Sequence, residues 1–112
     1  MGTSIRPEVS KKNEYWISRH RYYELKHFCL QYPEWKREYA ARNGDAERRE
    51  QLKIWMDMVE TAAGEAADDL GEMMLRAVTE GLSYVSLSPP CCKEVWYAAY
   101  RRFFWILNGM RK

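Results

Sequence analysis

This chain of 112 residues carries a net charge of +2, and 46% of its residues are hydrophobic, so it can bury a core without a metal or disulfides. Its three cysteines, two of them adjacent, form no disulfide framework, which fits a cytoplasmic protein. No apolar run approaches the roughly 20 residues that span a bilayer, so we expect no membrane contact. Few Gly and Pro residues, with many Glu, Lys, Arg, Ala, Leu and Met residues, favour an all-α fold.

Helix signals begin shortly after the N-terminus. Residues 1–14 mix Ser, Lys, Pro and Gly without a hydrophobic period, so we expect a flexible N-terminal arm there and a single helical domain over residues 15–112. Ser18 is a suitable N-cap for a helix that runs to about Gln31. Pro33 should end that helix and lie in the first turn of a second one, because apolar residues keep helical spacing across it, at Leu25, Phe28, Tyr32, Trp35 and Tyr39.

The middle of the chain is predicted to form one long helix. The pair Asn43-Gly44 should close the preceding helix, and Asp45 is the expected N-cap of the long one. Apolar residues recur along it at three-then-four spacing, at Leu52, Trp55, Val59, Ala62 and Ala66. A break near Gly64 is compatible with the pattern, since glycine weakens a helix interior.

Three further helices are expected in the C-terminal part. Their limits follow from capping and breaking residues, namely Asp68 or Asp69 and Gly81 for the first, Ser83 or Tyr84 for the second, and Pro90 in the first turn of the last. The last helix has one apolar face, at Trp96, Ala99, Phe103, Ile106, Leu107 and Met110. Another face carries Lys93, Tyr97 and Arg101. A short helix, a turn and a packed helix with basic residues outside are typical of a helix-turn-helix reader of the DNA major groove, here in residues 69–108.

The charges are unevenly distributed along the chain. Lys and Arg residues number nine against five acidic residues in residues 1–44, four against ten in residues 45–80, and five against one in residues 81–112. A basic end indicates phosphate binding, but the acidic middle would equally well pair with the basic ends, within one molecule or between two. Charge alone leaves both interpretations open.

Two parts of the sequence resemble a known family. The segments AVTEGLSYVSL (77–87) and CCKEVWYAAYRRFFWIL (91–107) resemble the C-terminal part of small transcription activators of the RinA and ArpU type, encoded by Gram-positive phages and prophages. The segment HRYYELKHFCLQYPEWKREY (20–39) resembles the N-terminal part of many such prophage proteins. That family is similar in pattern to region 4 of sigma factors, where a Gly-Leu-Ser-Tyr start leads into a helix-turn-helix. This chain is shorter than that pattern after Tyr84, and Pro89-Pro90 stands where the pattern has a Gly-centred turn.

The candidate DNA-contacting residues are Ser83, Tyr84, Lys93, Tyr97, Arg101 and Arg102. The two arginines suit phosphates, or guanine edges if they reach the groove, and equally well suit a solvated helix face. Lys93 and Tyr97 lie nearer the helix N-terminus, the end that usually reaches bases. Ser83 is suited both to capping its helix and to touching a phosphate, and Phe104 and Trp105 are expected as extra core or dimer surface.

No pattern of residues predicts a metal site or catalysis. Possible metal ligands lack chelating spacing, at His20, His27, Cys29, Cys91 and Cys92. The carboxylates of the acidic middle are typical partners of helix N-termini, at Glu65, Asp68, Asp69 and Glu72. The sequence has no nucleophile–base pair, phosphate loop or dinucleotide fingerprint. We therefore expect no metal, no cofactor and no enzymatic activity.

These patterns predict a compact all-α domain of about five or six helices that binds double-stranded DNA as a phage-type transcriptional regulator. A homodimer would match paired half-sites, and RNA polymerase is a further expected partner. The alternative is a helical protein-interaction or scaffold protein, or a prophage remnant, without specific DNA binding. The outer face of the last helix discriminates between them. Exposed and unpaired Lys93, Tyr97 and Arg101 favour DNA binding, whereas pairing with the acidic middle or burial between subunits favours a scaffold.

Overall fold

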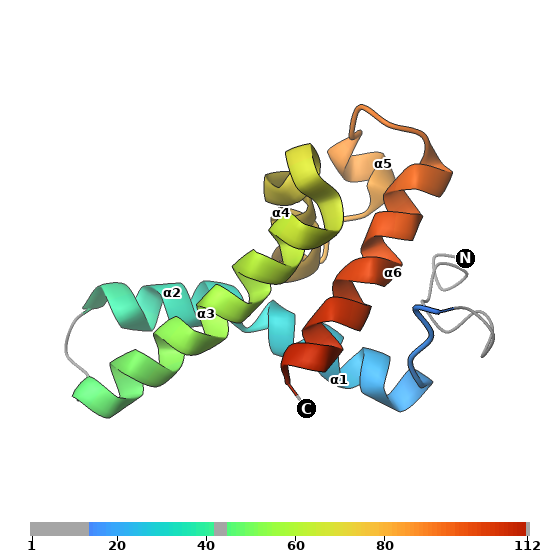
Figure 1. Ribbon diagram of the computed structural model, residues 1–112. Coiled ribbons are helices and arrows are strands. Elements are labelled where there is room, and N and C mark those ends of the chain that lie inside the picture. The colour runs from blue at the N-terminus through green and yellow to red at the C-terminus, as the bar shows by residue number, and fades with distance from the viewer. Residues whose placement is uncertain (1–13, 42–44, 112) are drawn as a thin grey trace.

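The computed structural model describes residues 14–41 and 45–111, and within these ranges the chain forms six α-helices, one 3₁₀ turn and no strand (Figure 1). The prediction of an all-α fold is confirmed. The described part measures 43 × 29 × 24 Å along its principal axes. The predicted N-terminal arm, apart from Glu14, and the predicted helix end at Asn43-Gly44 lie outside the described residues.

The first two helices, α1 (Arg19–Leu30) and α2 (Tyr32–Ala41), begin and break where the sequence predicts. The Ser18 hydroxyl accepts a hydrogen bond from the Arg21 N–H at 3.2 Å, which caps α1. Pro33 lies in the first turn of α2, where a backbone N–H has no partner within the helix, so the missing N–H of proline costs no helical hydrogen bond. The apolar stripe faces the core across this break, and all its members except the half-exposed Tyr39 are buried, at Leu25, Phe28, Tyr32 and Trp35.

The long helix α3 (Ala46–Ala67) is the central element, since α2, α4 and α6 all pack against it (Figure 1). The Asp45 carboxylate accepts from the Arg48 N–H at 2.7 Å, so the predicted N-cap is confirmed. The helix continues through Gly64 without a break, because buried alanines hold this turn against the core, at Ala62, Ala63 and Ala66.

Helix α3 ends in the turn η2 (Asp68–Leu70), which leads directly into α4 (Gly71–Glu80). Neither Asp68 nor Asp69 caps α4, so that prediction is wrong: the chain passes through a single 3₁₀ turn, which places Leu70 at the capping position with no side-chain bond. Asp68 has φ 49° and ψ −115°, a conformation that favours glycine. A Cβ on Gly71 would lie 3.2 Å from the Gly64 Cα, so a larger residue would push the backbones of the two helices apart by a few tenths of an ångström.

Helix α4 ends as predicted at Gly81, which has φ 72° and the left-handed conformation of a C-terminal cap. The short helix α5 (Tyr84–Leu87) follows, and the Ser83 hydroxyl accepts from the Ser86 N–H at 3.1 Å to cap it. Capping by Ser83 is therefore confirmed.

The last helix, α6 (Lys93–Met110), begins later than predicted, because Pro90 is outside it. The Cys91 N–H donates to the Pro89 carbonyl at 2.8 Å, so residues 89–91 form a tight turn instead of a first helical turn. Cys92 has extended backbone at the N-cap position, with φ −75° and ψ 163°. The prediction that placed the helix start near Pro90 is wrong for this reason.

One core joins α1, α2, α3, α4 and α6. The apolar stripe of α6 faces it as predicted, with Trp96, Phe103 and Leu107 fully buried. Phe104 is also buried and is thus extra core, whereas Trp105 keeps 44% of its surface exposed.

Candidate nucleic-acid interface

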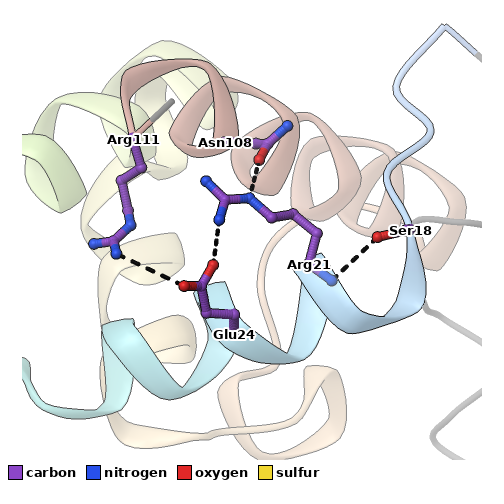
Figure 2. Close-up of polar contacts among 5 residues, drawn as sticks. All are labelled: Ser18, Arg21, Glu24, Asn108 and Arg111. Atoms are coloured by element: carbon purple, nitrogen blue, oxygen red, sulfur yellow. Dashed lines mark hydrogen bonds and ion pairs between the residues drawn. The ribbon is translucent and has the colours of Figure 1, made fainter.

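Helix α6 is fixed in place by a joint with α1 near its C-terminal end (Figure 2). Arg21 of α1 binds both the Glu24 carboxylate and the side-chain oxygen of Asn108. The Arg111 guanidinium lies 3.9 Å from the ring centre of Phe28 and 4.0 Å from the Glu24 carboxylate. These contacts set the direction in which the opposite end of α6 points.

Two tyrosines complete this joint. The hydroxyls of Tyr22 and Tyr100 lie 3.0 Å apart and are hydrogen-bonded to each other. Burial raises the pKa of Tyr100 well above its usual range, and the neighbouring Tyr22 raises it further. The joint therefore combines the charged contacts of Arg21 and Arg111 with an uncharged, partly buried hydrogen bond between the two tyrosines.

The corner between α5 and α6 positions the N-terminal end of α6. The Tyr84 hydroxyl donates to the Cys91 carbonyl at 2.6 Å, and the Tyr84 ring packs on Tyr97, with centroids 6.0 Å apart. Ser83 caps α5 and bonds the Ser86 hydroxyl at 3.1 Å. Of the candidate DNA-contacting residues, Ser83 and Tyr84 thus have internal partners that shape the corner.

Lys93, Tyr97 and Arg101 lie on one flank of α6, as the spacing predicts. Lys93 is exposed, Tyr97 and Arg101 are half-exposed, and Tyr97 packs between the rings of Tyr84 and Tyr100. Across the described ranges, the side chains of Lys93 and Arg101 have neither a hydrogen bond nor an ion pair. Two cations on this flank therefore remain available to an external anion.

Arg102 has a different environment from its neighbour Arg101. Its guanidinium donates to the backbone carbonyls of Ala66 at 2.8 Å and Glu65 at 3.4 Å, at the C-terminal end of α3. Those carbonyls are among the acceptors that a helix end leaves unpaired, and a cation is favoured there by the helix dipole. Arg102 thus ties α6 to α3.

The acidic middle of the chain does not pair with the cations of α6 in the part of the chain that the structure describes. Its carboxylates instead surround a surface hollow of about 500 Å³ between α3 and α4, at Glu60, Asp68, Asp69 and Glu72. Within that same part, no group of His, Cys, Asp or Glu side chains is placed to hold a metal ion. Within residues 14–41 and 45–111, no ion pair therefore joins the acidic middle to the cations of α6.

Sequence reasoning missed two exposed valines next to the candidate residues. Val85 on α5 is 78% exposed, and Val95 on α6 is 55% exposed. Val95 also lines a hollow of about 300 Å³ with Tyr15, Ala67 and Arg102. For Val95 the spacing did carry a signal, because this residue does not fall on the apolar stripe of α6.

Comparison with known proteins adds no functional assignment. The chain matches no protein-family model, no curated protein and no solved structure. The resemblance to phage activators therefore stays a prediction. Among residues 14–41 and 45–111, no helix is both long and apolar enough to cross a membrane.

Proposed function

We propose that this protein binds double-stranded DNA through the corner of α5 and α6, as a regulator of the phage type. The observation that carries the proposal is the pair of cations, Lys93 and Arg101, that share one flank of α6 without an internal partner. Cationic side chains without internal partners can neutralise DNA phosphates and release the counterions bound there. This release dominates the affinity of proteins for duplex DNA of any sequence.

The surroundings of these cations support the same function. Tyr97 lies between them along the helix and presents a partly exposed ring. The loop beside them carries serine hydroxyls and no acidic residue from Leu82 to Cys92, and the exposed Glu94, which follows Lys93, is the one acidic residue from Leu82 to Arg101. In this proposal Lys93 and Arg101 bind phosphates, Tyr97 and Lys93 approach base edges, and a homodimer would match paired half-sites.

The test is the affinity of the protein for random-sequence duplex DNA over a series of salt concentrations. The variant Lys93→Ala/Arg101→Ala removes both cations and leaves the Arg102 bond to α3 intact. We expect log affinity to fall linearly with log salt, and the double variant to reduce the slope by about one to two.

A matched control distinguishes the effect of the corner on DNA affinity from the effect of net charge. The variant Lys36→Ala/Arg37→Ala removes the same charge from two exposed residues of α2, on the far side of the molecule from α5 (Figure 1). The proposal predicts an unchanged slope for this control. Equal loss in both variants, or no binding by the wild type at low salt, would rule out the corner as a DNA-binding site.

A second candidate function is a protein-interaction module. It is favoured by the exposure of Val85 on α5 and Val95 on α6, the two helices that form the corner, since exposed apolar side chains are found at protein contacts. If the wild type binds no DNA, Val85→Ser and Val95→Ser should be tested for loss of self-association by analytical ultracentrifugation. Unchanged association would then exclude these valines as an interface.

A further inference from the structure

The three cysteines of the protein have unequal access to solvent. Cys29 is fully buried in α1, whereas Cys91 is half-exposed and Cys92 is exposed. Burial raises the pKa of the Cys29 thiol far above its usual range, which makes it inert. Any thiol chemistry therefore concerns the adjacent pair in the turn between α5 and α6.

The backbone of this pair holds the start of α6. The Cys91 carbonyl accepts the hydrogen bond from the Tyr84 hydroxyl at 2.6 Å, and the Cys91 N–H donates to Pro89 at 2.8 Å. The Cys92 carbonyl accepts from the Trp96 N–H at 3.0 Å, which is the first bond of the helix. Rotation of the peptide between Cys91 and Cys92 turns the Cys91 carbonyl away from the Tyr84 hydroxyl, between the two backbone bonds that hold this turn and the start of α6.

A bond between the two sulfurs requires such a rotation. Consecutive Cα atoms lie about 3.8 Å apart, below the usual range of about 4.4 to 6.8 Å for disulfide-linked residues. The extended backbone of Cys92 also directs neighbouring side chains to opposite sides. The turn as observed therefore fits two free thiols, and the disulfide needs another conformation.

We propose that Cys91 and Cys92 form a redox-active pair, whose reversible disulfide releases the start of α6 from the turn conformation that the Tyr84–Cys91 hydrogen bond holds. The oxidant is a peroxide. The exposed Cys92 thiolate attacks one peroxide oxygen, the O–O bond breaks, and a sulfenic acid and one water form. The Cys91 thiolate then attacks the Cys92 sulfur, the S–O bond breaks, and a second water leaves. Two thiols and one hydrogen peroxide thus give one disulfide and two waters.

Thermodynamic linkage gives this switch a measurable signature. The Tyr84 hydroxyl stabilises the reduced turn and loses its acceptor when the peptide rotates. Tyr84→Phe therefore weakens only the reduced form, and the ratio of disulfide to dithiol at a fixed glutathione potential should rise about fivefold. A disulfide that left the turn unchanged would show no such shift.

To test the disulfide switch, the full-length protein is treated with hydrogen peroxide, and its mass and its amide hydrogen exchange are measured. We expect a mass decrease of about 2 Da that maps to the peptide containing both thiols, is reversed by dithiothreitol, and is absent in Cys91→Ser. Amides of Trp96 and Tyr97 should exchange faster in the oxidised form. Disulfide-linked dimers, sulfinic acid alone, or an oxidised form with unchanged exchange would overturn the proposal.

One consequence of this switch rests on the proposed function, because Lys93 follows Cys92 directly. If the corner binds DNA, oxidation should weaken the affinity for duplex DNA, and the reduced protein should recover it. The mass and exchange measurements contain no DNA, so the thiol switch and the DNA-binding proposal can fail separately.

Discussion

The two halves of α6 differ in how they are held. In the C-terminal half, Phe103, Phe104 and Leu107 are almost completely buried, and the Tyr22–Tyr100 and Arg21–Asn108 contacts join the helix to α1. In the first six residues only Trp96 is buried, and four of the other five are exposed. We call the C-terminal half of α6 its anchored half, and the exposed N-terminal end its presented end. Because different residues form the two parts, stability and surface recognition can be changed independently.

The largest expected effect tests the anchored half directly. Phe103→Ala removes a side chain with no exposed surface, and should lower the free energy of unfolding by about 3 to 5 kcal/mol. Val95→Ala, at the presented end, should change it by less than about 0.5 kcal/mol. Urea unfolding followed by circular dichroism measures both, and similar losses would show that the two halves are equally packed.

The adjacent residues Arg101 and Arg102 allow a comparison of stability effects within one turn of α6. Arg102→Ala leaves the carbonyls at the end of α3 without their charged donor and should cost about 2 kcal/mol. Arg101→Ala removes no side-chain hydrogen bond or ion pair among the described residues and should leave the unfolding midpoint nearly unchanged. If Arg101→Ala proved the more destabilising variant, Arg101 would have an internal role that these contacts do not account for.

The buried tyrosine pair makes the anchored half sensitive to alkali. Tyr100 stays protonated in the folded state because its pKa is raised, while the unfolded chain ionises near pH 10. Stability is thus complete below about pH 9 and falls as pH rises above it, by about 0.7 kcal/mol per pH unit on average between pH 9 and 11 for this tyrosine. Urea titrations at pH 9 to 11 measure the slope. Tyr100→Phe should reduce it by that amount, and an unchanged slope would show that Tyr100 ionises freely in the folded state.

The smallest expected effect lies at the presented end. Ser88 has φ 48° and ψ 57°, a left-handed conformation that glycine adopts without a steric penalty. Ser88→Gly should therefore raise the free energy of unfolding by about 0.5 kcal/mol. Ser88→Ala is the control, because it removes the hydroxyl bond to Val85 while keeping the steric penalty. A stabilising alanine would assign the gain to the hydroxyl instead of the backbone.

Much of the fold followed from local chemistry in the sequence. The caps at Ser18, Asp45 and Ser83 each need one side-chain oxygen before a helix, and all three were predictable. The stripes on α1, α2, α3 and α6 were predictable for a similar reason, since helical spacing decides which residues share a face.

The errors arose where distant contacts or backbone geometry decided the structure. The start of α6 depends on the Tyr84–Cys91 bond across the turn, and local proline rules favoured Pro90 instead. The join of α3 to α4 depends on the close approach of Gly64 and Gly71, which capping rules for Asp68 and Asp69 ignore.

The candidate site was only partly predictable. Helical spacing placed Lys93, Tyr97 and Arg101 on one flank of α6, but it could not separate Arg101 from Arg102. The carbonyls that bind Arg102 lie more than thirty positions earlier in the chain. The sequence around two adjacent arginines does not show which guanidinium will bind the end of another helix, because that contact depends on residues far away in the chain.

The Tyr22–Tyr100 hydrogen bond also has a kinetic consequence. It joins residues 78 positions apart, whereas α2 and α4 pack on their immediate neighbour α3. Closing the longer loop costs more chain entropy, so the hairpins should form first and α6 should dock onto α1 after the rate-limiting barrier. Folding and unfolding rates of Tyr100→Phe would then show the change almost entirely in unfolding, with a φ-value of about 0. A φ-value near 1 would instead mean that this long-range contact nucleates folding.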